Sequence, residues 1–353
     1  MNNKKMVVGM SGGVDSSVAA YLLKEQGYDV IGVTMQTFLS RGETDAISDA
    51  KAVADRLGIE HHVIDFRDAF RGCVIDNFIA EYIGGNTPNP CVRCNRHVKW
   101  EALLELAGQF GAEYIVTGHY AKILKLDNGR YAVCKADHDN KDQAYVLYNL
   151  TQEQLAHTIM PLGEYSKDEI REMAKKIGLS VADKPDSQDI CFIPDNDYAG
   201  FIAANTKVPG PGNFVDTESN VLGRHEGIHK YTVGQRKGLN IALGRPVYVC
   251  EIRPDTDEVV LGDNEDVFTD EVFCNEVNHM AVDNFLKCEG ITAKVRYSGK
   301  DTACSVEYIA KDIVKCRFHS PVRAATPGQA LVFYKDNVVL GGGIIRRAKD
   351  VMN

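Results

Sequence analysis

Residues 11–17, of sequence SGGVDSS, follow a short apolar run at 6–10 and precede a helical pattern. A buried strand that turns at two glycines into a helix aims backbone N–H groups at one point, where the helix dipole adds to them. The three serine hydroxyls are further donors. The segment therefore predicts a phosphate or pyrophosphate site, the alternative being an ordinary turn rich in glycine and serine. It is not a Walker A loop, because it holds no lysine to reach terminal phosphates.

Composition is typical of a globular enzyme. The chain has 353 residues, 44% of them hydrophobic and 25% charged, which is long enough for two or three domains. The start, MNNKK, leads only into a short strand-like run, so we expect no signal peptide, no membrane span and a cytoplasmic location. The ten cysteines are then expected to be thiols, some of them catalytic or metal-binding. The net charge of −9 disfavours indiscriminate polyanion binding but allows a local basic face.

The first two hundred residues alternate strand and helix patterns, as a doubly wound parallel sheet requires. We predict an α/β domain over residues 1–200 that contains the phosphate-binding loop. Ser166 with Glu169 predicts a capping box at the start of its last helix. Strands are predicted over 6–10, 30–35, 62–65 and 114–117, and helices over 18–26, 45–57, 69–82, 98–110 and 166–177.

The pattern changes at the VPGPG segment 208–212, which cannot continue a helix or a central strand. Short glycine-rich runs follow, and they predict a small, mostly β central domain over residues 207–264. Period-two alternation then appears, most clearly at 293–297 and 314–318. It predicts a C-terminal β-barrel over residues 267–353.

Two cysteine-bearing segments stand far apart in the chain. The sequence NPCVRCN places Cys91 and Cys94 in a predicted loop just before a helix, and Cys191 lies in DSQDICFIP. A thiol near a helix N-terminus and flanked by cations is expected to have a lowered pKa. An ATP site together with two separated reactive cysteines suggests that ATP activates an oxygen which sulfur then replaces.

The chain resembles, from end to end, the bacterial tRNA-specific 2-thiouridylase family of the PP-loop ATP pyrophosphatases, which cleave ATP between the α and β phosphates. SGGVDSS matches the SGGxDS signature of the superfamily. Each further match is weak alone, but their order is very specific. The matching segments are 87–90, 94–95, 117–121, 141–143, 186–194, 225–227, 231–236, 326–329 and 340–343.

The resemblance implies 2-thiolation of the wobble uridine, position 34, in tRNAs for glutamate, glutamine and lysine. ATP with Mg²⁺ adenylates the 2-oxygen and pyrophosphate leaves. Cys191 carries a persulfide received from a cysteine desulfurase or a sulfur-relay protein, and Cys94 is its partner. Sulfur reaches C2, AMP leaves, and a Cys94–Cys191 disulfide remains for a reductant to open. No membrane partner and a monomeric state are also implied.

The resemblance also assigns binding residues. Its nucleotide-binding positions are Gly9, Met10, Ser11, Gly12, Gly13, Val14, Asp15, Ser16, Met35 and Gly118. Its tRNA-facing positions are Asn89, Pro90, Cys91, His119, Lys141, Asp142, Gln143, Tyr297, Ser298 and Gln329.

Cys91 departs from the family pattern, because many members carry there an aspartate with an acid/base role beside the target base. Cys91, Cys94 and Cys191 also supply three soft ligands, enough for an iron–sulfur cluster with one open iron, or for zinc with a fourth ligand. Cys-x-x-Cys is equally the spacing of redox dithiols. We prefer direct persulfide chemistry to an iron–sulfur cluster. A further interpretation is that Cys91 takes no part in the reaction.

An acidic protein must concentrate positive charge to hold tRNA. Residues 221–253 contain six Lys/Arg against two Glu, and Arg236 with Lys237 lies in a glycine-rich stretch suited to phosphate contacts. Tyr231 and Tyr297 are candidates for stacking on bases, or for the core. A second basic cluster lies beside Cys94 and consists of Arg93, Arg96 and Lys99. A third lies near the C-terminus and is expected to be solvated; it consists of Arg346, Arg347 and Lys349.

Two other functions compete with thiolation. A different PP-loop adenylating ligase would need no cysteines. A non-catalytic RNA-binding relative would carry a vestigial nucleotide loop, although the intact Asp15, Ser16 and both cysteines count against it.

Overall fold

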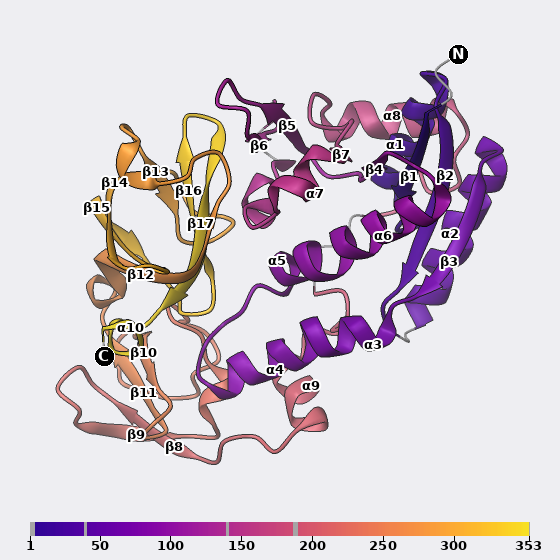
Figure 1. Cartoon of the computed structure of the whole chain (residues 1–353). Helices are drawn as coiled ribbons and strands as arrows, with labels where there is room; N and C mark the ends of the chain where they lie inside the picture. The colour runs from indigo at the N-terminus through magenta and orange to yellow at the C-terminus, as the bar shows by residue number, and fades with distance from the viewer. Residues whose placement is uncertain (1–3, 39–40, 139–140, 186–189, 353) are drawn as a thin grey trace.

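The computed structural model describes residues 4–38, 41–138, 141–185 and 190–352, so part of the predicted segment 186–194 lies outside the described residues. The strands form a five-stranded, a four-stranded and an eight-stranded sheet. Figure 1 shows the five-stranded sheet with its helices on one side of the molecule and the two β-rich parts on the other. In the part of the chain that is described, no helix combines the length and apolar character needed to span a membrane.

The first sheet is parallel throughout and has the order β3-β2-β1-β4-β7. Alternate residues of its central strand face opposite sides, Met6 and Val8 toward one apolar core and Val7 toward another. Both faces are therefore covered, which confirms the predicted doubly wound sheet. Its strands are β1 (Lys5–Gly9), β2 (Asp29–Gln36), β3 (Glu60–Asp65), β4 (Tyr114–Val116) and β7 (Thr158–Ile159).

Three helices, α1 (Val14–Glu25), α2 (Arg41–Leu57) and α8 (Lys167–Lys176), contribute side chains to the core that contains Met6. The predicted capping box of α8 is confirmed, since the Glu169 N–H donates to Ser166 Oγ and Glu169 Oε2 accepts from the Ser166 N–H. On the other face, α6 (Glu101–Phe110) packs through Leu103 against the core that contains Val7.

The segment with the first two cysteines is helical, so the prediction of a loop there was wrong. α5 (Pro90–Cys94) continues through the π-helical segment Asn95–Trp100 into α6. Asn89 is the N-cap, its side-chain oxygen accepting from the Cys91 N–H at 3.1 Å, and Pro90 occupies the first helical position. The residues that suggested a loop are those that begin a helix.

A second long helical stretch leads away from the sheet toward the central part of the chain (Figure 1). It consists of α3 (Arg67–Phe70), the π-helical segment Arg71–Ile75 and α4 (Asp76–Ile83). The remaining short helices are α7 (Gln152–Ala156), α9 (Tyr198–Asn205), α10 (Ala348–Val351) and 3₁₀ turns at Ala144–Leu147, Ile228–Lys230, Glu265–Val267 and Phe285–Lys287.

The four-stranded sheet has the order β10-β11-β8-β9 and encloses its own small core. Tyr231 is buried in that core against Phe214 and His225, so it packs as a core residue and not as an exposed stacking residue. The strands are β8 (Gly212–Val215), β9 (Val221–His225), β10 (Tyr248–Arg253) and β11 (Glu258–Gly262).

The third sheet closes on itself, because β12 pairs with both β15 and β17. This confirms the predicted β-barrel. An unpredicted hairpin of β5 (Ala121–Lys125) and β6 (Tyr131–Lys135) joins its edge, with Cys134 opposite Val338. The barrel strands are β12 (Phe268–His279), β13 (Thr292–Lys294), β14 (Thr302–Ala310), β15 (Ile313–Arg323), β16 (Ala330–Lys335) and β17 (Val338–Arg346).

Two of the three cations of the basic C-terminal cluster, Arg346 and Arg347, join parts of the chain, so the expectation of a solvated cluster was wrong for them, whereas Lys349 is exposed as expected. The Arg347 guanidinium donates to the backbone carbonyls of Gly84, Gly85 and Ile252, at 3.2, 2.6 and 3.3 Å. Arg346 donates to Glu81 at the end of α4. Carbonyls and carboxylates from three separate segments therefore satisfy these arginines.

Candidate functional site

The loop between β1 and α1 has the backbone geometry of an anion site. Gly13 is the N-cap of α1 and, having no side chain, makes no cap bond to the first N–H groups of that helix. Gly12 has φ +68°, and a Cβ there would overlap the carbonyl oxygen of Ala46 on α2. A Cβ on Gly118, which follows β4, would stand 2.6 Å from the backbone nitrogen of Ser16. Only glycine fits at either position.

The three serines of the loop do not play the same part. Ser16 is buried and its Oγ accepts from the Ser11 N–H at 3.1 Å, while Ser11 Oγ lies 3.2 Å from Ser16 Oγ. Ser17 Oγ donates to the Gly13 carbonyl at 2.7 Å. The expectation of three hydroxyl donors for a ligand was therefore wrong for Ser17, which stabilises the first turn of the helix.

The other predicted nucleotide positions gather at the carboxyl end of the sheet. Thr34 Oγ1 donates to the Met10 carbonyl at 2.9 Å and so fastens the end of β2 to the end of β1, with the half-buried Met35 next along the strand. Gly118 completes the set from β4. Ligands of open α/β sheets bind at this edge.

Asp15, in the first turn of α1, is held by two residues that sequence reasoning did not single out. Tyr120 Oη donates to Asp15 Oδ1 at 2.7 Å, and Lys167 Nζ lies 2.7 and 2.8 Å from the two carboxylate oxygens. Lys184 Nζ donates to the Gly12 carbonyl at 3.1 Å and pairs with Asp49 at 2.6 Å. The sequence offered one indication of where Lys167 lies: it directly follows Ser166, the predicted capping residue, and so begins α8.

The cysteine side chains meet at one place. Cys94 is buried in an apolar cluster that includes Phe192, the neighbour of Cys191. Burial raises the pKa of the Cys94 thiol, against the nearby Lys99 charge, which lowers it. Cys191 is an exposed residue, yet burial first, then the Cys94 and Cys91 charges, raise the pKa of its thiol to about 12. The predicted lowering of the thiol pKa was therefore wrong, because burial outweighs the cations.

Lys99 is a cation that affects both cysteines and also His119, which follows the glycine packed on the nucleotide loop. Its charge lowers the pKa of Cys94, Cys191 and His119 alike, so it lies within electrostatic reach of all three. Burial, followed by Lys99, lowers the pKa of His119 to about 3, so the imidazole is neutral at physiological pH. His119 directly follows Gly118, which packs on Ser16 of the nucleotide loop.

Several predicted tRNA-facing side chains make contacts within the protein. The Asp142 carboxylate accepts from the Ala136 and Ala144 N–H groups at 3.1 and 3.2 Å, and burial raises the pKa of Asp142. Gln143 Oε1 accepts from the Tyr120 N–H at 2.9 Å, and Gln329 Nε2 donates to the Thr87 carbonyl at 2.8 Å. The Asp142, Gln143 and Gln329 side chains thus hold backbone segments in place.

Tyr297 and Ser298, by contrast, are exposed on the barrel. Tyr297 Oη donates to the backbone carbonyl of Asp142 at 2.8 Å. The structure therefore brings together two predicted tRNA-facing groups, the 141–143 segment and the 297–298 turn, that lie 155 residues apart at this contact.

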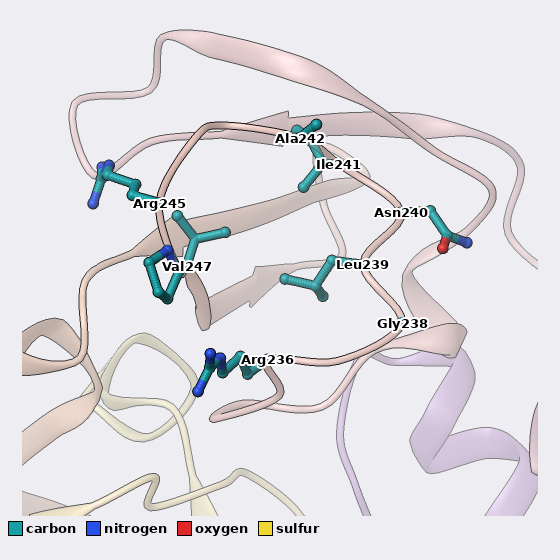
Figure 2. A pocket seen from close by; sticks show the side chains of 9 residues that line it. Arg236, Gly238, Leu239, Asn240, Ile241, Ala242, Arg245 and Val247 are labelled. Carbon is teal, nitrogen blue, oxygen red and sulfur yellow. The ribbon is translucent and has the colours of Figure 1, made fainter.

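The central sheet carries a hollow of about 400 Å³ on its glycine-rich loop. Arg236 and Arg245 lie on the same side of the loop, whereas Leu239 points toward its interior (Figure 2). Arg236 and Lys237 are exposed, and Arg245 pairs with Asp263. Within the described ranges, no three His, Cys, Asp or Glu side chains are grouped so that they could hold a metal ion.

A doubly wound sheet with a glycine-rich loop at its carboxyl edge, two distant cysteine segments brought together and two appended β domains is the architecture expected of a PP-loop enzyme of sulfur chemistry. Three family models match in sequence: the "tRNA methyl transferase HUP domain" over residues 4–195, the "tRNA methyl transferase PRC-barrel domain" over 199–263 and the "Aminomethyltransferase beta-barrel domain" over 269–345. With the relatives described next, they show that the chain belongs to the tRNA-specific 2-thiouridylase family.

The relatives match over almost their full length. The tRNA-specific 2-thiouridylase MnmA of Lachnoclostridium phytofermentans is 56% identical, over 97% of this chain and 99% of the relative. The protein of the same name from Clostridium perfringens is 52% identical, over 98% and 99%. Among solved structures, a U34-tRNA thiolase from Methanococcus maripaludis aligns at 22% identity with a TM-score of 0.38, over 58% of this chain and 65% of the other. That likeness supports no inference about function.

Proposed function

We propose that the protein catalyses ATP-dependent 2-thiolation of uridine 34 in tRNAs for glutamate, glutamine and lysine, releasing AMP and pyrophosphate. One observation carries the proposal: Cys94 and Phe192, the neighbour of Cys191, lie in one buried cluster, so the two distant cysteine segments come together in a chain whose Gly118 packs on the nucleotide loop. An adenylated base held between the loop and the cysteines would be within reach of both.

Activation comes first. The 2-oxygen of uridine attacks the α-phosphorus of ATP, the bond to the bridging oxygen breaks, and its electron pair leaves with pyrophosphate. The N–H groups at the start of α1 and the exposed Ser11 would receive the phosphate charge. An amide-like carbonyl becomes a good electrophile only when its oxygen can leave, and adenylation provides that leaving group.

Mg²⁺ fits the donor set beside the loop. The Ser11 hydroxyl and the remaining lone pairs of the Asp15 carboxylate, whose oxygens also accept from Lys167 and Tyr120, are hard oxygen donors of the kind that Mg²⁺ prefers together with substrate phosphates. When bound, the ion would neutralise phosphate charge.

Sulfur transfer follows, with a persulfide on Cys191 as donor. The terminal sulfur attacks C2 of the base, and AMP leaves with the electron pair of the C2–oxygen bond. The Cys94 thiolate then attacks Cys191 Sγ, which forms the Cys94–Cys191 disulfide and leaves the terminal sulfur on the base. Two electrons from an external reductant reopen the disulfide. The nearby Lys99 charge favours the Cys94 thiolate that this step needs.

The alternative route to the same thiolation uses an iron–sulfur cluster held by Cys91, Cys94 and Cys191 in place of the persulfide. Metal analysis of anaerobically purified protein separates the two routes, with less than one iron per chain expected for the persulfide route. Cys91→Asp adds a test, since the variant should keep its activity unless a cluster needs that thiol. Several irons per chain together with an inactive Cys91→Asp variant would favour the cluster.

The tRNA is proposed to lie across the exposed cations Arg236 and Lys237, the turn at Tyr297 and the exposed Cys191. A cysteine desulfurase or a sulfur-relay protein would load Cys191.

We propose a monomer in the cytoplasm, where thiols persist, in keeping with ten free cysteines. Domain limits of 1–200, 207–264 and 267–353 are supported by the ranges over which the family models match.

The test is mass spectrometry of nucleosides from unmodified tRNA incubated with the protein, Mg²⁺-ATP and a persulfide donor, a cysteine desulfurase with cysteine. We expect 2-thiouridine from the wild type and none from Cys191→Ser. Cys288→Ser, a half-buried thiol of the barrel, is the matched control and should stay active. Full activity in both Cys94→Ser and Cys191→Ser would support the adenylating ligase, and no ATP use with tRNA and a sulfur source would support a binding protein.

A further inference from the structure

The nucleotide loop has no lysine of its own, but two lysines reach it from elsewhere in the chain. Lys167, the first residue of α8, places its ammonium 2.7 and 2.8 Å from the Asp15 carboxylate oxygens. Its side chain is 12% exposed, so most of this charge is held within the protein beside the start of α1. Tyr120 fixes the same carboxylate from another direction.

Lys184 reaches the loop by a second route. Its ammonium donates to the Gly12 carbonyl at 3.1 Å and pairs with Asp49 of α2 at 2.6 Å. Gly12 directly precedes the N-cap Gly13, and Asp15 lies in the first turn of α1, so both ammonium groups contact the start of this helix. Both cations follow β7 in the chain, far from the glycine motif in sequence.

Cleavage of ATP between the α and β phosphates moves negative charge onto pyrophosphate. N–H groups at the end of one helix provide only about half a positive charge, whereas each lysine provides a full one. We propose that Lys167 and Lys184 bind the β and γ phosphates of ATP and stabilise the departing pyrophosphate. The electron pair of the broken bond leaves with the pyrophosphate.

This inference rests on the proposed use of ATP. The alternative is a purely structural role, in which the two lysines only hold α8 and α2 against the loop. The two differ in what they predict for nucleotides of different length, because a lysine that binds the β and γ phosphates has nothing to contact in AMP.

The experiment measures the dissociation constants of Mg²⁺-ATP and AMP for the full-length protein by calorimetry. Lys167→Met and Lys184→Met are each expected to weaken ATP binding by about 10- to 100-fold, the effect of losing a hydrogen bond to a charged group, and AMP binding by less than about twofold. Lys175→Met, on the same helix but paired with the exposed Asp183, is the matched control and should change neither.

Lys167→Arg keeps the charge and should restore most of the ATP affinity, which a defect in folding would not do. Equal losses for ATP and AMP, or no loss for ATP, would overturn the inference. If the wild type forms no 2-thiouridine, the proposed function fails, while a selective loss of ATP affinity in the lysine variants still supports the phosphate site.

Discussion

Arg346, at the end of the last barrel strand, forms an ion pair with Glu81 at the end of α4, 3.2 Å apart and 265 residues away in sequence. Each side chain is 17% exposed, and Arg346 also donates to Asn275 and to Glu276, at 2.9 Å each. A largely buried carboxylate on the helical domain thus depends on a cation from the barrel, so the two parts of the chain stabilise each other.

Arg346→Met is therefore expected to destabilise the protein strongly. Removing one partner of a buried pair costs about 3 kcal/mol, because the other charge stays buried without compensation. The matched control is Arg317→Met, whose pair with Glu271 lies on the barrel surface and is worth at most about 1 kcal/mol. Thermal unfolding measures both, and equal shifts in the two variants would contradict the role of Arg346 between the domains.

The loop glycine Gly12 offers a second comparison. Gly12→Ala should reduce ATP binding and stability together, because its φ of +68° is strained for alanine and the new Cβ would overlap the backbone of Ala46. Gly129 has the same left-handed backbone conformation, with φ +81°, but nothing lies within 4 Å of the position that a Cβ would take in Gly129→Ala. We expect about 1 kcal/mol of destabilisation for Gly129→Ala and about 1 to 3 kcal/mol more for Gly12→Ala.

Calorimetric ATP binding and thermal unfolding of both variants check this prediction. Gly129→Ala should bind ATP like the wild type. Normal ATP affinity in Gly12→Ala would show that the loop adapts, and would remove the argument that this position requires glycine.

Local features of this fold could be predicted from sequence because neighbouring residues decide them. The strand–glycine–helix order around Gly12 and the capping box at Ser166 depend on residues a few positions apart, and both are confirmed. The barrel was also predicted, since alternation marks each strand by itself.

What the sequence did not predict depends on residues that are distant in the chain. The Asp15–Lys167 pair spans 152 positions and has no spacing rule. Cys94 looked activated beside its cations, but its pKa is set by burial against a segment that includes Phe192. Arg347 was expected to be solvated, but it donates to the carbonyl of Gly85, just after α4, and to that of Ile252 in β10.

His119 should make the protein sensitive to acid. Burial, followed by Lys99, lowers its folded-state pKa to about 3, whereas the unfolded chain takes up the proton near the ordinary value of 6.5. Between these values the unfolded state binds more protons, so the contribution of His119 to stability is present above 6.5 and is lost as the pH falls toward 3. His119→Gln should therefore lose less stability between pH 7.5 and pH 5 than the wild type.

Thermal unfolding at the two pH values checks this, with His138→Gln, a more exposed histidine, as the control. The other buried histidines affect wild type and variant alike, so the difference between them reports on His119. An identical pH dependence in wild type and His119→Gln would mean that this imidazole titrates normally.

The thiol of Cys191 should be slow to react by itself. With a pKa of about 12, only about one molecule in ten thousand carries the thiolate at pH 8, so alkylation by iodoacetamide should be much slower than that of a simple thiol. Lys99→Met should slow it about fivefold further, the effect of losing about 1 kcal/mol of attraction between charges. Peptide mapping of the alkylated protein gives both rates, and Lys4→Met, at the opposite end of the sheet, is the control.

A slow Cys191 bears on how sulfur is delivered. A thiol that is almost wholly protonated attacks a free sulfane donor poorly, whereas a protein donor docked at the exposed Cys191 could remove the proton during transfer. Thiolation should therefore run faster with a persulfide-bearing protein than with equimolar inorganic polysulfide. If Cys191 instead alkylates faster than glutathione at pH 7.5, burial does not control its reactivity, and the two sulfur sources should support similar rates.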